Sequence, residues 1–544
     1  MRRRFPTLAR LVALLALVTL MASLAAPATA ANETSDVAST QGFRKAVTLA
    51  GIREHQAAFQ SFADQFGGNR VSGGAGGFDA SAQYVYDRMA AAGYNVSFQE
   101  FTFTFVGDRT PPVLEQVSPT PATYVDGVDF ATMSYSGSGD VTAPLVAVDL
   151  VVPAPGPGAT TSGCEAADFA GFPAGAIALM QRGTCTFRAK ADNARAAGAS
   201  GAIIFNDGGD AGRQGVIFGT LSPPPHSLPV VGTTFALGDN LRNGVLNGPT
   251  GVTVHLKTDM IAEARPTRNV IAETPGGDPN RVIVIGAHLD SVTRGPGIND
   301  NGSGSATILE IAEVFAAQGR EARNKLRFMW YGAEEFGLIG STFYVNSLSQ
   351  AERDQIELML NFDMIGSPNY VRFVYDGDNS AFPVGPGVQL GPPGSGEIER
   401  VFRDYFTSQG LASEPTPFSG RSDYGPFITN GIPAGGLFTG AEGVKTAGQA
   451  VIYGGIAGTQ YDPCYHLACD TFAGTGDGPN ATAPGLGLKA LDEMSDAVAH
   501  AVLYFSKRDF AKNPLVNPAA AVGGTTGTTG GGGLHDHDDE RVAR

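Results

Sequence analysis

The stretch from residue 281 to 304 places metal-binding side chain types around the end of one predicted strand. Four consecutive β-branched residues, Val282 to Ile285, are typical of a strand buried on both faces of a parallel sheet. The run ends at His288 and Asp290, and in open α/β sheets ligands bind at this carboxyl end. Asp300 follows on a loop that begins an amphipathic helix. These side chains form the beginning of a metal site, although each alone is commonly a solvated loop residue.

Later segments bring further ligand-type side chains, namely Glu334, Glu335, Asp363 and His466. The three acidic residues follow predicted strand ends, and the histidine lies in a tight loop between two cysteines. Carboxylates gathered so closely would repel each other unless a cation neutralised them. Because histidines are present, Zn²⁺ is the natural cation. A carboxylate such as Asp300 can bridge two ions, so we expect a two-metal site.

Length and composition indicate an exported protein with two folded units and appendages. The chain has 544 residues, which is too long for one ordinary domain. Three arginines at positions 2–4, an apolar run over 11–24 and the small residues 28–30 predict a secretory signal at residues 1–30. The run is short for a membrane anchor and no second candidate follows, so we expect no anchor. Export by the general secretory or the twin-arginine route remains open.

Charge and cysteine content fit a secreted protein. Removing the signal takes away four arginines and no acids, which moves the net charge from −16 to −20. Such an acidic surface argues against nucleic acid or anionic membrane as a partner. Four cysteines in an exported chain indicate two disulfides, and sequence proximity pairs them as Cys164–Cys185 and Cys464–Cys469.

Hydrophobic patterns predict an α/β domain interrupted by a β-rich insert. Residues 31–106 read as the first part of the α/β domain, although 31 to about 45 are polar and expected to be flexible. Residues 107–260 form the insert, with a helix near 187–197 and β-like runs at 145–152, 176–180, 201–205 and 216–218. Alternating strands and helices over 261–510 predict a mostly parallel central sheet flanked by helices. Residues 511–544 are expected to be a disordered tail, with histidines that could take up metal.

The chain resembles a secreted zinc aminopeptidase of the M28 family, in the branch typified by bacterial leucine-type aminopeptidases. The matching blocks are AHLDS, GINDNGSG, WYGAEEFGLIGS, NFDMIGS, GRSDYGPF, GGLFTGAE and CYHLACD. They occur in this order over residues 45–105 and 268–507 and are together highly specific. The insert is similar to a protease-associated (PA) domain through IALMQRGTCTFRAKADNARAAGASGAIIFND. The resemblance implies a zinc-peptidase/phosphorylase-like α/β fold with a small inserted PA domain.

The resemblance also implies two sets of metal ligands. His288, Asp300 and Asp363 would hold one zinc ion. Asp300 would bridge to a second zinc ion, which Glu335 and His466 would also hold.

Further roles follow from the same blocks. Glu334 would be the general base that takes a proton from the metal-bound water, or hydroxide precursor, and later delivers it to the leaving amine. Asp290 would orient His288. Tyr465 would donate a hydrogen bond to the oxyanion, and Arg421 matches a residue that contacts the substrate backbone in close relatives. A packed ring and a salt-bridge partner are the structural alternatives for these last two residues.

The expected substrate is a peptide with a free N-terminus. Glu334 and Asp363 would bind its α-amine, and an apolar pocket including Met364 and Phe438 would favour large hydrophobic residues. The chain has Tyr424 where close relatives often have histidine, which we expect to alter the rim of the substrate site.

Two features allow more than one interpretation. Some relatives have a calcium site near the last helix, for which Asp492 and Asp496 are candidates, although exposed helix acids are the simpler interpretation. The loop Gly67 to Arg70 could be functional or a plain connection. The chain is expected to be a monomer.

Other functions explain the sequence less well. A related carboxypeptidase needs an arginine cluster for the substrate carboxylate, which Arg421 alone does not provide. A glutaminyl-cyclase-like enzyme uses one metal and does not usually carry a PA insert. A non-catalytic receptor on the same scaffold would have lost metal ligands, whereas all five are present here. A serine hydrolase is not supported, because the sequence has no Gly-x-Ser-x-Gly elbow in a strand-to-helix setting. A single-zinc protease is not supported either, because there is no His-Glu-x-x-His helix.

Overall fold

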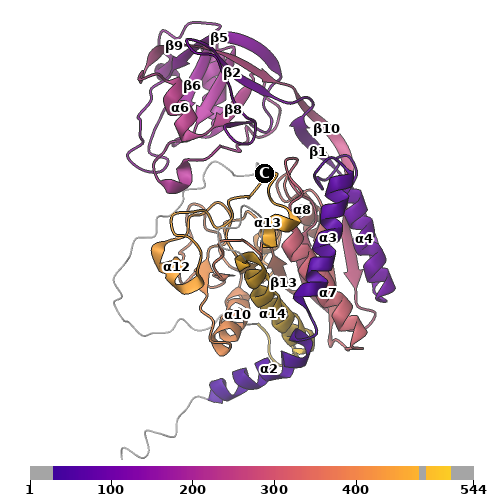
Figure 1. Ribbon diagram of the computed structural model, residues 1–544. Helices are drawn as coiled ribbons and strands as arrows, with labels where there is room; N and C mark the ends of the chain where they lie inside the picture. The colour runs from indigo at the N-terminus through magenta and orange to yellow at the C-terminus, as the bar shows by residue number, and fades with distance from the viewer. Residues whose placement is uncertain (1–27, 477–484, 516–544) are drawn as a thin grey trace, which may run out of the picture.

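The computed structural model describes residues 28–476 and 485–515, which form two units stacked one above the other (Figure 1). Most of the predicted signal and most of the predicted tail lie outside the described residues. Within the described part of the chain, no helix is long and apolar enough to cross a membrane.

The larger unit is built on an eight-stranded mixed sheet. Its strands are β1 (Asn95–Asp108), β10 (Met260–Glu273), β11 (Asp278–His288), β12 (Asn324–Tyr331), β13 (Ile356–Phe362), β14 (Phe373–Tyr375), β15 (Glu414–Thr416) and β16 (Ala434–Phe438). Their order in the sheet is β1-β10-β12-β11-β13-β16-β14-β15. The four central strands, β12, β11, β13 and β16, run parallel, whereas β10 and β14 join them antiparallel. The predicted α/β fold with a mostly parallel centre is confirmed.

Helices cover both faces of this sheet. Ile283 and Ile285 of β11 face a core that includes α3 (Leu49–Gln65), α4 (Gly77–Ala91), α7 (Gly302–Ala317), α10 (Ser395–Ser408) and α14 (Leu486–Lys507). Val282 and Val284 face the opposite core, with α8 (Ile339–Ser347) and α11 (Tyr424–Thr429). Burial on both faces explains why successive residues of this strand are all apolar. Three shorter helices complete the unit: α9 (Gln350–Arg353), α12 (Ala447–Tyr453) and α13 (Phe472–Gly476).

An N-terminal helix corrects one prediction. Residues 31–45 were expected to be flexible, but α2 (Ala28–Arg44) covers almost all of them. Phe43 is fully buried and meets the ring of Phe315 edge-on, with 6.0 Å between ring centroids. Thr40 Oγ1 lies 2.9 Å from Nδ1 of His500 on α14. A few buried contacts therefore hold this helix against the larger unit. Its polar composition gave no sign of them.

The smaller unit is the β-rich insert. Its sheet has the order β3-β2-β9-β5-β6-β7-β8-β4. The strands are β2 (Val113–Ser118), β3 (Ala122–Thr123), β4 (Phe130–Thr132), β5 (Gly139–Ala147), β6 (Ile177–Gln181), β7 (Gly201–Phe205), β8 (Val230–Thr233) and β9 (Gly248–Thr258). Two helices, α5 (Phe187–Ala196) and α6 (Phe235–Leu241), pack against β7.

The predicted strand at 216–218 is wrong. These residues pass over the face of β8, where a Cβ on Gly232 would lie only 2.3 Å from the Ile217 carbonyl oxygen. Ile217 is buried by this close approach and not by joining the sheet.

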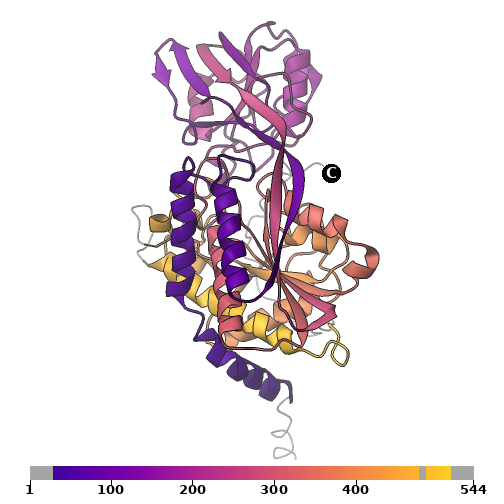
Figure 2. The same cartoon turned by 90° about the vertical axis from the view of Figure 1, so that its right-hand side faces the viewer.

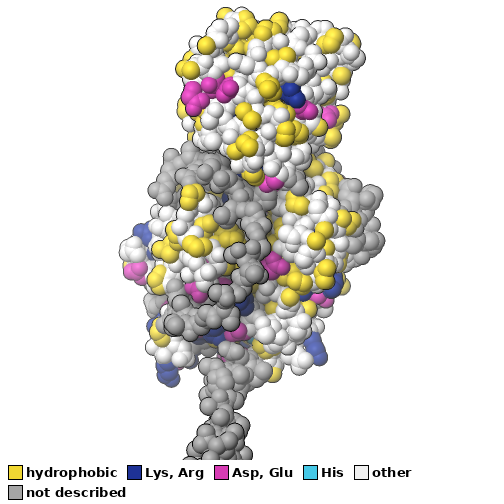
Figure 3. Space-filling model, turned by 90° about the vertical axis from the view of Figure 1, so that its left-hand side faces the viewer, with side chains coloured by type: hydrophobic (Ala, Val, Ile, Leu, Met, Phe, Trp, Pro, Cys, Tyr) yellow, Lys and Arg dark blue, Asp and Glu magenta, His cyan; other side chains and the backbone are white. Residues whose placement is uncertain are grey.

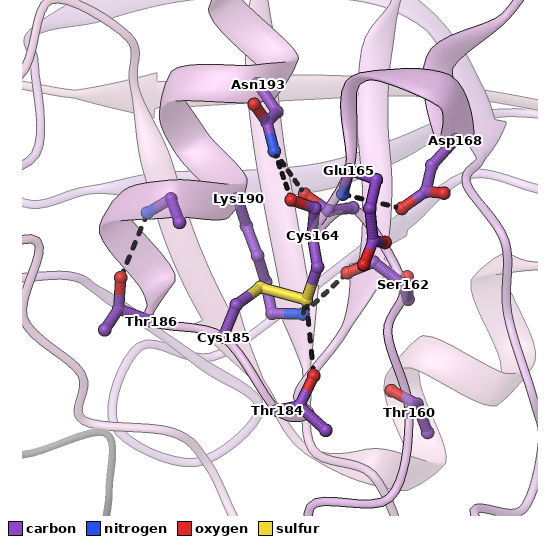
Figure 4. The surroundings of a disulfide bond; sticks show 12 residues. Thr160, Ser162, Cys164, Glu165, Asp168, Thr184, Cys185, Thr186, Lys190 and Asn193 are labelled. Atoms are coloured by element: carbon purple, nitrogen blue, oxygen red, sulfur yellow. Dashed lines mark hydrogen bonds between the residues drawn. A yellow bond between two sulfur atoms is a disulfide. The ribbon is translucent and has the colours of Figure 1, made fainter.

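Both predicted disulfides are present, Cys164–Cys185 and Cys464–Cys469. Figure 4 shows the first of them, with Asn193 of α5 bound to the Cys164 carbonyl at 2.8 Å. The buried Lys190 amino group lies beside the same disulfide and donates to the Ser162 carbonyl at 2.6 Å. The disulfide therefore ties the start of α5 to the loop before β6.

A two-stranded ribbon connects the two units. β1 and β10 pair antiparallel over their whole length, and Figure 2 shows them rising from the larger unit into the smaller one. The insert also touches the larger unit at Arg294, which donates to Asp126 at 2.9 Å and lies 4.9 Å from the ring centroid of Phe218. On the face in Figure 3, Lys and Arg side chains of the described residues are few and separated.

Candidate metal centre

The carboxyl ends of the central parallel strands bring the predicted ligands together. β11 ends in His288, and the neighbouring strands β12 and β13 lead directly into Glu334-Glu335 and Asp363. Asp300 precedes α7, whose N-cap Asn301 binds the Gly304 amide through its side-chain oxygen at 2.9 Å. The side-chain amide of Asn301 also donates to the carbonyl of Phe362 at 2.9 Å, which fastens this loop to the end of β13.

Asp300 stands between two groups of ligand atoms. Its Oδ1 lies 3.3 Å from His288 Nε2, which is also 3.3 Å from Asp363 Oδ1. Its Oδ2 lies 3.2 Å from His466 Nε2, which is 3.1 Å from Glu335 Oε2. The structure thus brings together all five predicted ligands, in the two sets of three that share Asp300.

Two carboxylate oxygens of these residues lack hydrogen-bond partners, as expected of metal ligands. Glu335 Oε1 and Asp363 Oδ1 are buried and have no hydrogen-bond partner. Buried polar atoms in folded proteins nearly always have a partner, so such oxygens suit a cation. Two imidazoles and three carboxylates form a donor set appropriate to a pair of Zn²⁺ ions.

Burial and the neighbouring charges shift the pKa values of the carboxylates. Burial raises the pKa of Glu334 well above its ordinary value and raises the pKa of Glu335 to about 7. Burial also opposes ionisation of Asp300, but hydrogen bonds with His288 and His466 outweigh it and lower the pKa of Asp300 below its ordinary range. The ionised form of Asp300 is therefore favoured, whereas Glu334 is suited to hold a proton.

Asp290 and Ser422 contact three of the central residues. His288 Nδ1 lies 3.1 Å from the backbone carbonyl of Asp290 and 3.7 Å from its carboxylate. Asp290 Oδ1 also accepts the backbone N–H of Glu334 at 3.2 Å. Ser422 Oγ donates to Asp363 Oδ2 at 2.6 Å, which leaves Oδ1 to face the centre. Sequence reasoning missed Ser422, although it lies inside the block GRSDYGPF.

Two more residues that sequence reasoning missed support the Asp300 loop. The Asp470 carboxylate accepts the backbone N–H groups of Asn299 and Asp300, at 2.7 and 2.9 Å. The fully buried guanidinium of Arg70 donates to the backbone carbonyls of Leu289, Pro296 and Gly297. The signals were weak: Asp470 directly follows the second cysteine of CYHLACD, and Arg70 ends the glycine-rich loop that had two interpretations.

Three residues at or next to the predicted ligands have a left-handed backbone conformation. Ala333, Met364 and His466 have φ values of 57°, 52° and 59°, in the left-handed region that side chains other than glycine rarely adopt. Each is a ligand or directly adjoins a predicted catalytic or ligand residue. Strained residues persist where the surrounding structure fixes them, and they cluster at functional sites.

Arg421 and Tyr465 form one connected group beside His466. The Tyr465 ring stacks on the His466 ring, with 3.8 Å between centroids. Arg421 Nη2 donates to the Tyr465 hydroxyl oxygen at 3.2 Å, and Nη1 donates to Glu442 at 2.6 Å. Arg421 is therefore a salt-bridge partner that also contacts the predicted oxyanion donor.

The predicted pocket residues lie at the same edge of the sheet. Met364 directly follows the ligand Asp363 and is 3% exposed. Phe438 ends β16 and stacks on Phe373, with 6.1 Å between ring centroids. Tyr424, expected at the rim, is instead 1% exposed and packs in the core beside Tyr375 and Phe418.

The calcium candidates do not form a ligand cluster. Asp492 and Asp496 lie on α14, and the Arg44 guanidinium is 3.7 Å from Asp496. Among the described residues, neither acid belongs to a group of three or more side chains spaced to hold a metal ion.

A parallel sheet whose strand ends gather two imidazoles and several buried carboxylates defines a metal-dependent hydrolase. The model of peptidase family M28 matches residues 269–479, and the PA domain model matches residues 141–241. An aminopeptidase of Pseudomonas aeruginosa is 48% identical over 442 residues, covering 81% of this chain and 77% of that protein. Leucine aminopeptidase 2 of Trichophyton tonsurans is 41% identical over 478 residues, covering 87% and 88%.

Solved structures show the same fold. The aminopeptidase from Aneurinibacillus sp. strain AM-1 is 26% identical and superposes with a TM-score of 0.61, over 88% of this chain and 98% of that one. The chain belongs to peptidase family M28 and is a metallo-aminopeptidase with a PA domain. The family and the enzyme class predicted from the sequence are thereby confirmed.

Proposed function

We propose that this protein is a secreted, di-zinc aminopeptidase that removes large hydrophobic residues of the leucine type from peptide N-termini. The observation that carries the proposal is the position of Asp300, whose two carboxylate oxygens face two separate ligand sets. Relatives named leucine aminopeptidase support the substrate class. The signal-like residues 1–30 and the two disulfides support secretion.

Each zinc ion would have three protein ligands. His288 and Asp363 would hold the first with Asp300, and Glu335 and His466 would hold the second with Asp300. When bound, Zn²⁺ supplies a Lewis acid that polarises the peptide carbonyl and makes water a better nucleophile at neutral pH.

Glu334 would carry the proton. Its carboxylate lies 3.8 Å from His288 Nε2, and Asp290 holds its backbone N–H, so the group is aimed at the centre from a fixed position. Burial raises the pKa of Glu334, which suits a group that accepts a proton from water and then donates it to the nitrogen of the leaving amine.

Tyr465 would stabilise the negative charge that develops on the substrate oxygen. In its contact with Arg421 the phenol oxygen accepts, so a hydrogen bond to the substrate uses the O–H as donor. The ion pair between Arg421 and Glu442 would hold this group in place.

Substrate selection would combine charge and shape. The carboxylates of Glu334 and Asp363 suit a protonated α-amine, which a blocked N-terminus lacks. Phe438, which is only partly buried, would offer apolar surface for the side chain of the first residue, whereas Met364 is 3% exposed and contributes little of it. The insert at 107–260 contacts the Asp300 loop through Arg294 and would limit the approach of bulky folded substrates.

The decisive experiment is hydrolysis of leucine p-nitroanilide by the mature protein, with and without a chelator. We expect activity that depends on metal and is absent with the N-acetylated substrate. Glu334→Gln should lower kcat by about 10²- to 10⁴-fold while two zinc ions stay bound. Glu397→Gln is the matched control, because Glu397 is also a buried glutamate but pairs with Arg508 away from the site.

Three outcomes would contradict the proposal. Two bound zinc ions without turnover of any unblocked substrate would favour a receptor-like protein. Release of C-terminal residues would favour a carboxypeptidase. Failure to bind metal would mean that the centre itself is misidentified.

A further inference from the structure

The loop between Asp290 and Asp300 has no regular secondary structure, yet it carries the bridging carboxylate. Its backbone groups therefore need partners outside helices and strands. Two buried side chains, a guanidinium and a carboxyl group, supply several of them. Arg70 comes from the loop between α3 and α4, and Asp470 comes from the segment after the second disulfide.

Arg70 holds the outgoing and the returning ends of this loop. The residue is fully buried, and its Nη1 donates to the Leu289 carbonyl at the end of β11. Its Nε and Nη2 donate to the carbonyls of Pro296 and Gly297, at 2.8 and 2.6 Å. The backbone N–H of Arg70 binds Ser291 Oγ at 2.9 Å. One guanidinium thus connects backbone groups on both sides of the loop.

A buried charge needs such compensation. Moving a cation out of water costs several kcal/mol unless hydrogen bonds and opposite charges offset the loss. Three carbonyls and the Phe59 ring, 5.1 Å from the guanidinium, surround Arg70. Burial lowers the pKa of Arg70 to about 10, and the nearby acids Asp290, Asp470, Asp300 and Glu335 oppose this lowering. Arg70 is therefore still cationic at neutral pH, behind the carboxylates.

Asp470 complements Arg70 on the other backbone groups. Its two oxygens accept the N–H groups of Asn299 and Asp300, at 2.7 and 2.9 Å. The Asp470 carbonyl accepts the N–H of Ile298 at 3.2 Å. The Arg70 guanidinium thus binds the carbonyls of Pro296 and Gly297, and the Asp470 carboxyl group binds the N–H groups of the residues that follow.

We propose that Arg70 and Asp470 are positioning residues that fix Asp300 between the two metal positions, with Arg70 also balancing the charge of the carboxylates. Among the described residues, neither side chain belongs to the two ligand sets. The inference rests on the proposed zinc centre, but it concerns metal affinity and geometry and does not depend on which peptide is cleaved. Residues that orient metal ligands typically change metal affinity or activity by about 10- to 100-fold when they are mutated.

The test compares Arg70→Met, Arg70→Lys and Asp470→Asn by zinc affinity, kcat, KM and thermal stability. Zinc-free protein is titrated with Zn²⁺ against a chromophoric chelator, which gives both dissociation constants without any activity assay. Arg372→Met is the matched control, because Arg372 is 4% exposed, donates to the Ala412 carbonyl and pairs with Glu493 away from the centre.

We expect Arg70→Met to weaken the looser zinc site and to lower kcat, each by about 10- to 100-fold, with a smaller change in KM. Arg70→Lys keeps the charge but not the three-way donor geometry, so it should recover part of the affinity. Asp470→Asn should lose a similar part of the zinc affinity and of kcat, because the side-chain NH₂ of asparagine would face a backbone N–H that needs an acceptor. Arg372→Met should lower only the melting temperature.

The proposal fails if Arg70→Met and Asp470→Asn are folded, bind two zinc ions as tightly as wild type and keep kcat. If Arg70→Met does not fold, the zinc affinities of Arg70→Lys and Asp470→Asn test the proposal in its place. A wild-type protein that binds two zinc ions without cleaving peptides would refute the aminopeptidase proposal and leave this one standing. A wild-type protein without zinc affinity would overturn both.

Discussion

Removing a single hydroxyl, in Tyr465→Phe, tests how the chain stabilises the transition state. The substitution keeps the ring that stacks on His466, so the imidazole should remain in place. It deletes the oxygen that accepts from Arg421 at 3.2 Å and the O–H proposed to face the substrate. The perturbation is thus confined to one donor and one acceptor.

The expected magnitude follows from the role of an oxyanion donor. Losing one such donor typically costs about 2.7–4 kcal/mol, or about 10²- to 10³-fold in kcat. KM should change little, because the substrate carbonyl carries much less charge than the oxygen in the transition state. Arg421→Met should also lower kcat, because Arg421 holds the hydroxyl oxygen. In the double variant the two losses should not add, since Arg421 acts through Tyr465.

The assay is steady-state hydrolysis of leucine p-nitroanilide, with zinc content measured on the same samples. Tyr504→Phe is the matched control: the Tyr504 hydroxyl also lies beside an arginine, with Arg508 Nη1 donating at 3.3 Å, but on α14. It should retain full activity. Unchanged kcat in Tyr465→Phe with both zinc ions bound would refute the oxyanion role. Losses that multiply in the double variant would show that Arg421 acts independently.

Two further variants test the substrate pocket and the stability of the fold. Phe438→Ala should lower kcat/KM for leucine substrates by about 10- to 100-fold and for alanine substrates much less, because a leucine side chain gains roughly 1.5–3 kcal/mol on burial. Burial lowers the pKa of His500 to about 4, so its neutral form is favoured in the folded state. This stabilisation is complete above the unfolded pKa of about 6.5 and is lost as pH falls towards 4, by up to about 3 kcal/mol. In urea unfolding between pH 6.5 and 4, His500→Gln should lose less of its free energy of unfolding than the wild type.

The clustering of the proposed metal ligands could be predicted because their positions follow from strand geometry. A strand buried on both faces needs a continuous apolar run, and polar residues directly after such runs must meet at one edge of a parallel sheet. His288, Glu335 and Asp363 satisfy this rule. His466 could be located by its disulfide loop, which restricts the imidazole independently of any strand.

The supporting residues could not be predicted in the same way. Arg70 and Asp470 form hydrogen bonds with backbone carbonyl and N–H groups of a distant segment. Every residue has such backbone groups, so the sequence does not indicate which of them a side chain will bind. α2 escaped prediction for a related reason, since only a few side chains such as Phe43 dock it. Irregular packing likewise buried Ile217 without adding a strand. Long-range contacts thus determined each of these features.

The electrostatics of the centre connect its two kinds of residues. Arg70 is a fixed positive charge, but several acids surround it, and the excess negative charge must be neutralised in some way. Burial raises the pKa of Glu334 and Glu335, so in the absence of a cation these carboxylates tend to retain protons. A metal ion competes with those protons for the same oxygens, because carboxylate ligands bind only when deprotonated. The burial that disfavours the carboxylate charge therefore also creates the affinity for a cation, provided that the Asp300 loop holds its shape.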